Sequence, residues 1–462
     1  MKRTGLLLAA SMIAALGGCG YMERTFSRSP TAAVSGSDSG RPCAWLPGER
    51  DQWRLRRSAV REKVRQLVVP GLQKAELDAW LMVERDYQRD PMMNALGLTE
   101  PGDKAVLLLD GGGAQPRAFG FASSPDVVWQ MTQSGLFEQV LPLTADAVEG
   151  TLDRFRPRRI GINYSGRVPF ADGIATGTRQ FAAWLVGRKY AGTFRSAEAL
   201  AVGFRSTRTA EETELARQAA RCAVEIAERV LATGLHSGQT SAEELAWYAR
   251  DEIRAARVEG ESLPRVFLVR PDDASSRAWP WLGVNSATTV KAGDLVLIDV
   301  DLRYAGAAAA VQRTAYVPGR WRSEPPADIR RAFDVLVAAR GGLAPLFRAG
   351  RAGRQIAADA SAWAQQHQVH LDLLAHPVGD MPRDAGTVAR DATSAGPYDE
   401  AETLADRPLQ EGDVQLLQYR VQVSLDNGAQ LALSAADEGV VGYAGLDFLV
   451  PPPNALMLAS SS

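Results

Sequence analysis

The pattern of apolar and polar residues predicts two successive regions of mixed secondary structure. In the first region, the pattern over residues 52–90 is helical, with DAWLMVERD at 78–86 as a strand or the start of a helix. Short strands follow at 104–110 and 158–165. The second region begins near residue 205, where a capping box at Thr209–Glu212 starts an alanine-rich helix and a second capped helix ends near Ala255. Further elements are expected as strands at 265–270, 295–300 and 308–317, helices near 325–348 and 353–368, and strands within 410–445, where Asn427-Gly428 predicts a hairpin.

The N-terminus has the pattern of an export signal. Lys2 and Arg3 precede an apolar run over residues 5–16, which is of signal-peptide length and short for a membrane span. The run ends in L-G-G-C at Cys19, which resembles the bacterial lipobox, in which such a cysteine is acylated; the alternative is an ordinary secretory signal with an incidental cysteine. Gly20 after that cysteine favours the outer membrane, with the protein facing the periplasm, as the place in the cell envelope.

Composition places the rest of the chain among folded proteins. The 462 residues suit two domains, and the hydrophobic content of 46% with 23% charged residues is typical of globular proteins. A net charge of −2, without a basic run, gives no basis for nucleic-acid binding. Residues 1–19 are expected to be the signal peptide, 20–44 a flexible tether and 448–462 a loose C-terminal tail.

Two cysteines remain besides Cys19. Cys43 and Cys222 could pair in an oxidising compartment. Cys222 lies within a helical apolar pattern, however, so the sequence favours a buried free thiol at this position.

Few residues of the sequence are candidates for metal binding or catalysis. The four histidines, His236, His367, His370 and His376, form no compact metal-binding motif. The one noteworthy combination is a strand ending in Asp299 and Asp301, followed far downstream by H-P-V-G at 376–379. Taken singly, these residues are equally well explained as solvent-facing carboxylates and a loop histidine.

Taken in order, several segments resemble the pita-bread metallopeptidases, the family of aminopeptidase P, prolidase, methionine aminopeptidase and creatinase. They are GDLVLID at 293–299, YAGAAAAVQRTAYV at 304–317, HPVG at 376–379 and LQEGDVQLLQ at 409–418, with further similarity at 160–173, 196–220 and 238–253. The resemblance covers about residues 45–447. It implies an α+β fold, with a creatinase-like N-terminal domain at 45–205 and a pita-bread domain with a curved, mostly antiparallel sheet at 206–447.

The resemblance also implies where metal ligands should lie. Active members hold two divalent cations with two aspartates eleven positions apart, one histidine and two glutamates. The first aspartate corresponds to Asp299 and the histidine to His376, but the second aspartate falls on Ala310. The two glutamates fall on Gln418 and on Ala436, the latter close to Asp437 and Glu438, of which only one can point inward on a strand.

These replacements change what the site is expected to do. One carboxylate in place of four cannot balance two dications, which prefer about six oxygen ligands each, so no cofactor is expected. A second family histidine is replaced by Arg383, and no catalytic residue is assigned. Without metal, the family mechanism has no activated water.

Two alternatives concern the remaining carboxylates. Asp299, Asp301, His376 and Asp380 could form a different, single-ion site for Mn, Co or Zn. We favour the hypothesis that a guanidinium replaces the lost cations and neutralises Asp299. The residues available for this are Arg383, Arg313 and Arg420.

The sequence therefore predicts a lipoprotein that is anchored to membrane lipid through acylated Cys19 and has a non-catalytic, aminopeptidase P-like cleft. Its partner would be an unidentified peptide or protein, and a homodimer is possible. The alternatives are an active Xaa-Pro-type metalloaminopeptidase or other hydrolase with a rebuilt single-metal site, and a purely structural envelope protein.

Overall fold

The computed structural model describes residues 40–85, 88–98, 103–270, 284–319, 324–390 and 404–459. The chain from Arg41 onward forms one compact unit. The predicted signal peptide, Cys19 and residues 20–39 of the predicted tether lie outside the described residues, whereas the end of the predicted tether is not flexible, because Cys43 is buried and disulfide-bonded. Among the described residues, no helix has the length and apolar character needed to cross a membrane.

A six-stranded mixed sheet, in the order β4-β3-β2-β1-β5-β6, organises the first region. Its strands are β1 (Ala79–Glu84), β2 (Ala105–Asp110), β3 (Arg117–Ala122), β4 (Gln139–Pro142), β5 (Ile160–Ile162) and β6 (Phe194–Ser196). The helices are α1 (Glu49–Lys74), α2 (Pro91–Ala95), α3 (Pro125–Ser134), α4 (Ala145–Phe155), α5 (Thr176–Ala191) and α6 (Glu198–Ser206), with a short 3₁₀ turn at Pro169–Ala171.

The central strand of this sheet is apolar on both faces because each face carries a helical layer. Trp80 and Met82 of β1 pack into a cluster that includes side chains of α1, α3 and α6. Leu81 and Val83, which point the opposite way, pack into a cluster with side chains of α4 and α5. The continuous apolar run is therefore a strand buried from both sides.

Two five-stranded sheets organise the second region, in the orders β16-β10-β9-β7, with β8 also paired to β9, and β12-β11-β13-β14-β15. Their strands are β7 (Glu259–Gly260), β8 (Arg265–Val269), β9 (Leu295–Tyr304), β10 (Ala307–Tyr316), β11 (His370–Pro377), β12 (Ala389–Arg390), β13 (Val414–Ser424), β14 (Gln430–Val441), β15 (Leu446–Phe448) and β16 (Met457–Leu458). The helices are α7 (Ala210–Arg229), α8 (Ala242–Ala255), α9 (Ala327–Leu343) and α10 (Gly353–Gln366), with short turns at Val230–Gly234 and Ala344–Leu346.

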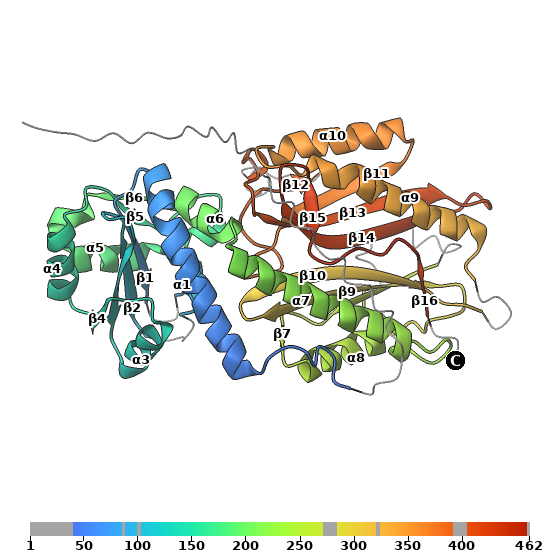
Figure 1. Cartoon of the computed structure of the whole chain (residues 1–462), viewed down its shortest axis with the longest axis horizontal. Helices are drawn as coiled ribbons and strands as arrows, with labels where there is room; N and C mark the ends of the chain where they lie inside the picture. Colours follow the sequence, from blue (N-terminus) through green and yellow to red (C-terminus); the bar gives the residue numbers. More distant parts are fainter. Residues whose placement is uncertain are drawn as a thin grey trace, which may run out of the picture. The chain divides into compact units, whose positions relative to one another are not determined.

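Helices lie on the outer faces of these two sheets (Figure 1). Helices α7 and α8 pack on the sheet of β9 and β10, and α9 and α10 pack on the sheet of β13 and β14. The predicted capping box is present, since Thr209 accepts from the Glu212 amide while the Glu212 side chain accepts from the Thr209 amide. These layers confirm the predicted α+β class and leave the inner faces of the two sheets toward each other.

The C-terminal segment is held more firmly than the sequence predicted. Strand β16 pairs in parallel with β10, and the Ala459 amide donates to the Tyr316 carbonyl. Arg340 donates to the Pro453 carbonyl and to the Asn454 side chain. The expectation of a loose tail is therefore wrong as far as Ala459. The outer edge of β10 has backbone N–H and C=O groups that pair with the C-terminal segment.

The two cysteines form a disulfide, so the free thiol that the sequence favoured at Cys222 is also wrong. Cys43 and Cys222 have Cα atoms 5.5 Å apart, and both are fully buried. The helical apolar pattern around Cys222 was correctly identified, but that face of α7 packs against the segment preceding α1. Glu225 fixes the same segment by accepting from the Cys43 amide and from the Trp45 indole.

Candidate functional site

The site begins on the β9–β10 hairpin, whose register sets which side chains share a face. Asp299 pairs with Gln312, and Asp301 pairs with Ala310. Paired residues of adjacent strands point to the same side, so these four side chains share the inner face. Ala310 lies where the resemblance places a bridging aspartate, and its methyl group offers no ligand atom.

An arginine lies against both aspartates. Arg265 on β8 pairs in register with Asp299. Its Nη2 atom is 3.3 Å from Asp299 Oδ2 and 3.5 Å from Asp301 Oδ2. The predicted guanidinium is therefore present, but it is Arg265 and not Arg383, Arg313 or Arg420. The sequence did predict a strand at 265–270, and this strand could have pointed to Arg265. In the sheet it lies two strands away from the strand that carries Gln312.

Gln312 completes the surroundings of Asp299. Its Nε2 donates to Asp299 Oδ1 at 2.6 Å, while its own buried Oε1 has no hydrogen-bond partner among the residues that the structure describes. Burial raises the pKa of Asp299 to about 6, and Arg265 and Gln312 limit that rise. Burial also raises the pKa of Asp301.

The facing sheet supplies the other half of the site. In its register, His376 pairs with Leu416, which pairs with Glu438, and in the next inner row Gln418 pairs with Ala436. The two predicted glutamate positions are therefore cross-strand neighbours. Neither Gln418 nor Ala436 carries a carboxylate.

Of the two acidic residues near Ala436, Glu438 is the one that shares its inner face. Glu438 Oε1 accepts from the Ala310 amide at 2.5 Å, and its buried Oε2 has no hydrogen-bond partner within the described segments. Burial raises the pKa of Glu438 well above its ordinary value. Asp437 points the other way and accepts from Arg313 Nη1 at 2.8 Å. These two contacts join β10 directly to β14.

His376 is buried and next to positive charge. Burial, together with the charges of Arg383 and Arg265, lowers its pKa to about 4. Its Nδ1 lies 3.2 Å from the carbonyl oxygen of Pro377. Arg383 itself is exposed.

Asp380 belongs to a different cluster. Its carboxylate lies 3.6 Å from Arg205 Nη1 and 3.4 Å from Arg208 Nη1. These cations lower its pKa, although burial alone would raise it. The predicted grouping of Asp380 with Asp299, Asp301 and His376 is therefore not formed. In the described parts of the chain, no group of three or more His, Cys, Asp or Glu residues could hold a metal ion.

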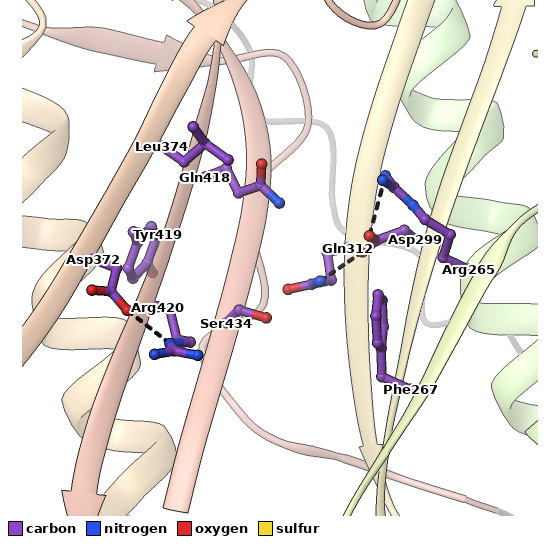
Figure 2. A pocket seen from close by; sticks show the side chains of 10 residues that line it. All are labelled: Arg265, Phe267, Asp299, Gln312, Asp372, Leu374, Gln418, Tyr419, Arg420 and Ser434. Carbon is purple, nitrogen blue, oxygen red and sulfur yellow. Dashed lines mark hydrogen bonds and ion pairs between the residues drawn. The ribbon is translucent and has the colours of Figure 1, made fainter. Parts of the chain in front are cut away.

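A pocket separates the two halves of the site (Figure 2). Arg265, Asp299 and Gln312 line it from one sheet, and Gln418 and Ser434 point into it from the other. The space between atoms is about 490 Å³, part of it open to solvent. Apolar side chains of Phe267, Leu374 and Tyr419 complete the wall, together with an Asp372–Arg420 ion pair whose Oδ2–Nε distance is 2.8 Å.

Comparison with known families assigns this region. The model of metallopeptidase family M24 matches residues 214–430. This stretch of the chain belongs to metallopeptidase family M24. A comparison with curated proteins finds no match.

Solved M24-type peptidases have the same fold as the chain. An X-Pro aminopeptidase from Thermotoga maritima matches with a TM-score of 0.61 at 15% identity, over 84% of this chain and 99% of that one. A Xaa-Pro dipeptidase from Bacillus anthracis matches at 0.57 and 16%, over 88% and 99%. The prolidase from Pyrococcus horikoshii matches at 0.56 and 17%, over 86% and 100%. The aminopeptidase P-like, pita-bread fold predicted from the sequence is confirmed.

Members of family M24 usually bind divalent metals, so the donor set can be compared with that need. Hard dications require several anionic or carbonyl oxygens converging on one point. Here a guanidinium lies against Asp299 and Asp301, and the Glu438 carboxyl is directed to a backbone amide. These residues do not fit a pair of dications.

Proposed function

We propose that this chain is a lipid-anchored, non-catalytic M24 protein that binds a peptide segment in the pocket of the former metal site. The observation that carries the proposal is the contact of Arg265 with both Asp299 and Asp301. A fixed guanidinium supplies positive charge at the place where the family places metal, but it cannot activate a water molecule as a metal ion does.

The small number of carboxylates at the site supports the proposal that the metal-dependent reaction has been lost. Ala310 removes the ligand that would bridge two cations, and Gln418 and Ala436 remove both glutamates. Burial raises the pKa of Glu438, which lies nearby on the inner face, and so disfavours its charged form. A neutral carboxyl is a poor substitute for a metal-binding carboxylate.

The lining of the pocket supports a peptide as the ligand. The Gln312 Oε1 atom needs a donor, and Gln418 offers an amide with both a donor and an acceptor. A peptide group offers the same two functions, and Phe267 and Tyr419 provide apolar contact for a side chain such as proline. The matching structures include enzymes named for Xaa-Pro substrates, so Xaa-Pro peptides are the first ligands to test.

The sequence of the N-terminus supports anchoring at Cys19, with the protein on the outer membrane facing the periplasm. The charged start, the apolar run and the L-G-G-C ending occur in the order of a lipoprotein signal. The disulfide between Cys43 and Cys222 suits an oxidising compartment such as the periplasm.

Metal analysis combined with a cleavage assay tests the loss of catalysis. The purified protein is incubated with Mn²⁺, Co²⁺ or Zn²⁺, desalted, analysed for bound metal and assayed with Xaa-Pro peptides. We expect substoichiometric metal and no metal-dependent cleavage. One metal ion or more per chain together with metal-dependent cleavage would refute the proposal.

Calorimetric titration with a non-cleaved Xaa-Pro tripeptide tests the binding role. We expect saturable binding that Gln418→Ala weakens several-fold, because its amide lines the pocket. Gln422→Ala is the matched control, since Gln422 lies on the same strand but outside the pocket. Equal affinity in the wild type and both variants would exclude this pocket as the peptide site.

A further inference from the structure

A second pocket lies between α1, the turn after α2, and α3, away from the M24 site. Its space between atoms is about 690 Å³, part of it open to solvent. Residues that line it include Trp53, Arg56, Arg57, Trp129 and Gln133. Among the described lining residues there is no carboxylate, and the charged ones, Arg56 and Arg57, are both positive.

Arg57 of α1 lies in the pocket wall and Arg61, one turn further along the helix, lies beside the pocket, and neither has an acidic partner among the described residues. The position that a Cβ atom of Gly135 would occupy is 2.9 Å from Arg61 Nη1 and 3.5 Å from Arg57 Nη2. Both guanidiniums therefore lie beside the C-terminal end of α3. Within the described part of the chain, neither donates a hydrogen bond nor forms an ion pair, and the Arg57 Nε atom is buried without a partner.

The neighbouring carboxylates are engaged elsewhere. Glu62 pairs with Arg65, and Asp51 pairs with Arg54, all on α1. Arg57 and Arg61 repel each other, and this lowers the pKa of Arg57 in addition to the effect of its burial. An anion placed between the two guanidiniums would remove that repulsion and supply the missing acceptors.

Besides a negative charge, the aromatic side chains of the pocket favour a ligand with a flat ring. The Arg57 guanidinium carbon lies 4.3 Å from the centre of the Trp53 ring, in a cation–π contact. Trp129, across the pocket on α3, is 61% exposed, which is unusual for so large an apolar side chain. Two accessible indoles beside two unpaired guanidiniums suit a flat ring that bears an oxyanion.

We propose that this pocket binds a small anionic ligand with a flat ring, its carboxylate or phosphate on Arg57 and Arg61 and its ring against Trp53 and Trp129. The bidentate geometry of each guanidinium matches either oxyanion. The site is separate from the peptide pocket, so this inference does not depend on the proposed function.

Calorimetric titration of the full chain in detergent tests the inference, with phenyl phosphate and benzoate as probes for the two oxyanions. We expect at least one of them to bind saturably and benzyl alcohol, the neutral analogue, not to bind. Arg57→Gln and Arg61→Gln should each weaken binding by about tenfold or more, since each removes charge-assisted hydrogen bonds. Trp129→Ala should weaken it by about tenfold as well, through loss of ring contact.

Arg54→Gln is the matched control, because Arg54 lies on the same helix but outside the pocket. It should leave affinity unchanged, and circular dichroism should give the same melting curve for every variant. Absence of saturable binding by both probes up to about 10 mM would overturn the inference. So would binding of benzyl alcohol as tight as that of the anions, or unchanged affinity in both the Arg57→Gln and the Arg61→Gln variant.

Discussion

Replacing Arg265 by leucine tests whether its charge has taken over the role of a cation. The guanidinium nitrogen is 3.3 Å from Asp299 and 3.5 Å from Asp301. At an effective dielectric constant of about 20, each contact contributes roughly 5 kcal/mol of gross Coulomb attraction. Desolvation of the carboxylates offsets most of this attraction, and the Arg265 side chain is 40% exposed, so solvent screens the rest.

The expected loss of folding stability lies between the values known for exposed and for buried ion pairs. Exposed ion pairs contribute about 0–1 kcal/mol, and breaking a buried pair costs about 3–5 kcal/mol. Arg265→Leu should therefore lower the free energy of unfolding by about 2 kcal/mol. The exposed pair of Arg254 and Asp251 provides a control, because Arg254→Leu should cost less than about 0.5 kcal/mol.

The assay is a thermodynamic cycle from urea unfolding followed by circular dichroism. Arg265→Leu is compared in the wild type and in an Asp299→Asn, Asp301→Asn background, where no carboxylate remains to be left unpaired. We expect the cost of removing Arg265 to fall close to zero in that background. An equal cost in both backgrounds would refute the charge argument and assign the loss to packing of the arginine stem.

Three further predictions concern other parts of the chain. Burial raises the pKa of Asp413 from its ordinary 3.8 to about 6, so between about pH 4 and 6 the folded chain keeps a proton that the unfolded chain loses. Stability from this group falls as pH rises through that window, and Asp413→Asn should stabilise the protein by up to about 3 kcal/mol at pH 8 but not at pH 4, as measured by urea midpoints. Reduction of the disulfide with dithiothreitol should lower stability by about 2–5 kcal/mol, whereas a Cys43→Ser, Cys222→Ser variant should not respond to the reductant. Cys19→Ser should abolish labelling by radioactive palmitate and release the protein from membranes, and persistent labelling would show acylation elsewhere.

Local pattern was sufficient to predict most elements of the second region. The capping box at Thr209 and the hairpin signal at Asn427-Gly428 depend on residues close in sequence, and both features are present. The alternation rule also held at Asp437 and Glu438, of which only Glu438 faces inward. Of the positions carried over from the family, Asp299 and Ala310 lie on one sheet, and His376, Gln418 and Ala436 lie on the other.

Pairing between distant strands could not be predicted in the same way. Arg265 reaches Asp299 through the register of β8 against β9, two strands separated by 25 residues that include a stretch outside the described part of the chain. Arg383 replaces a family histidine, and this substitution made Arg383 the expected partner of Asp299. The arginine that contacts Asp299 is Arg265. The disulfide was missed for a related reason, since burial of Cys222 gave no information about which segment covers it.

The bond between Cys43 and Cys222 also determines how mechanical load would enter the molecule. On a chain anchored at Cys19, tension from the membrane arrives along the N-terminal segment and meets the disulfide before it reaches α1. The covalent bond passes that force to α7, which packs on β9 and β10 beneath the site. The six-stranded sheet lies after the disulfide along the chain, so tension applied through the N-terminal segment would reach α7 before it reaches that sheet.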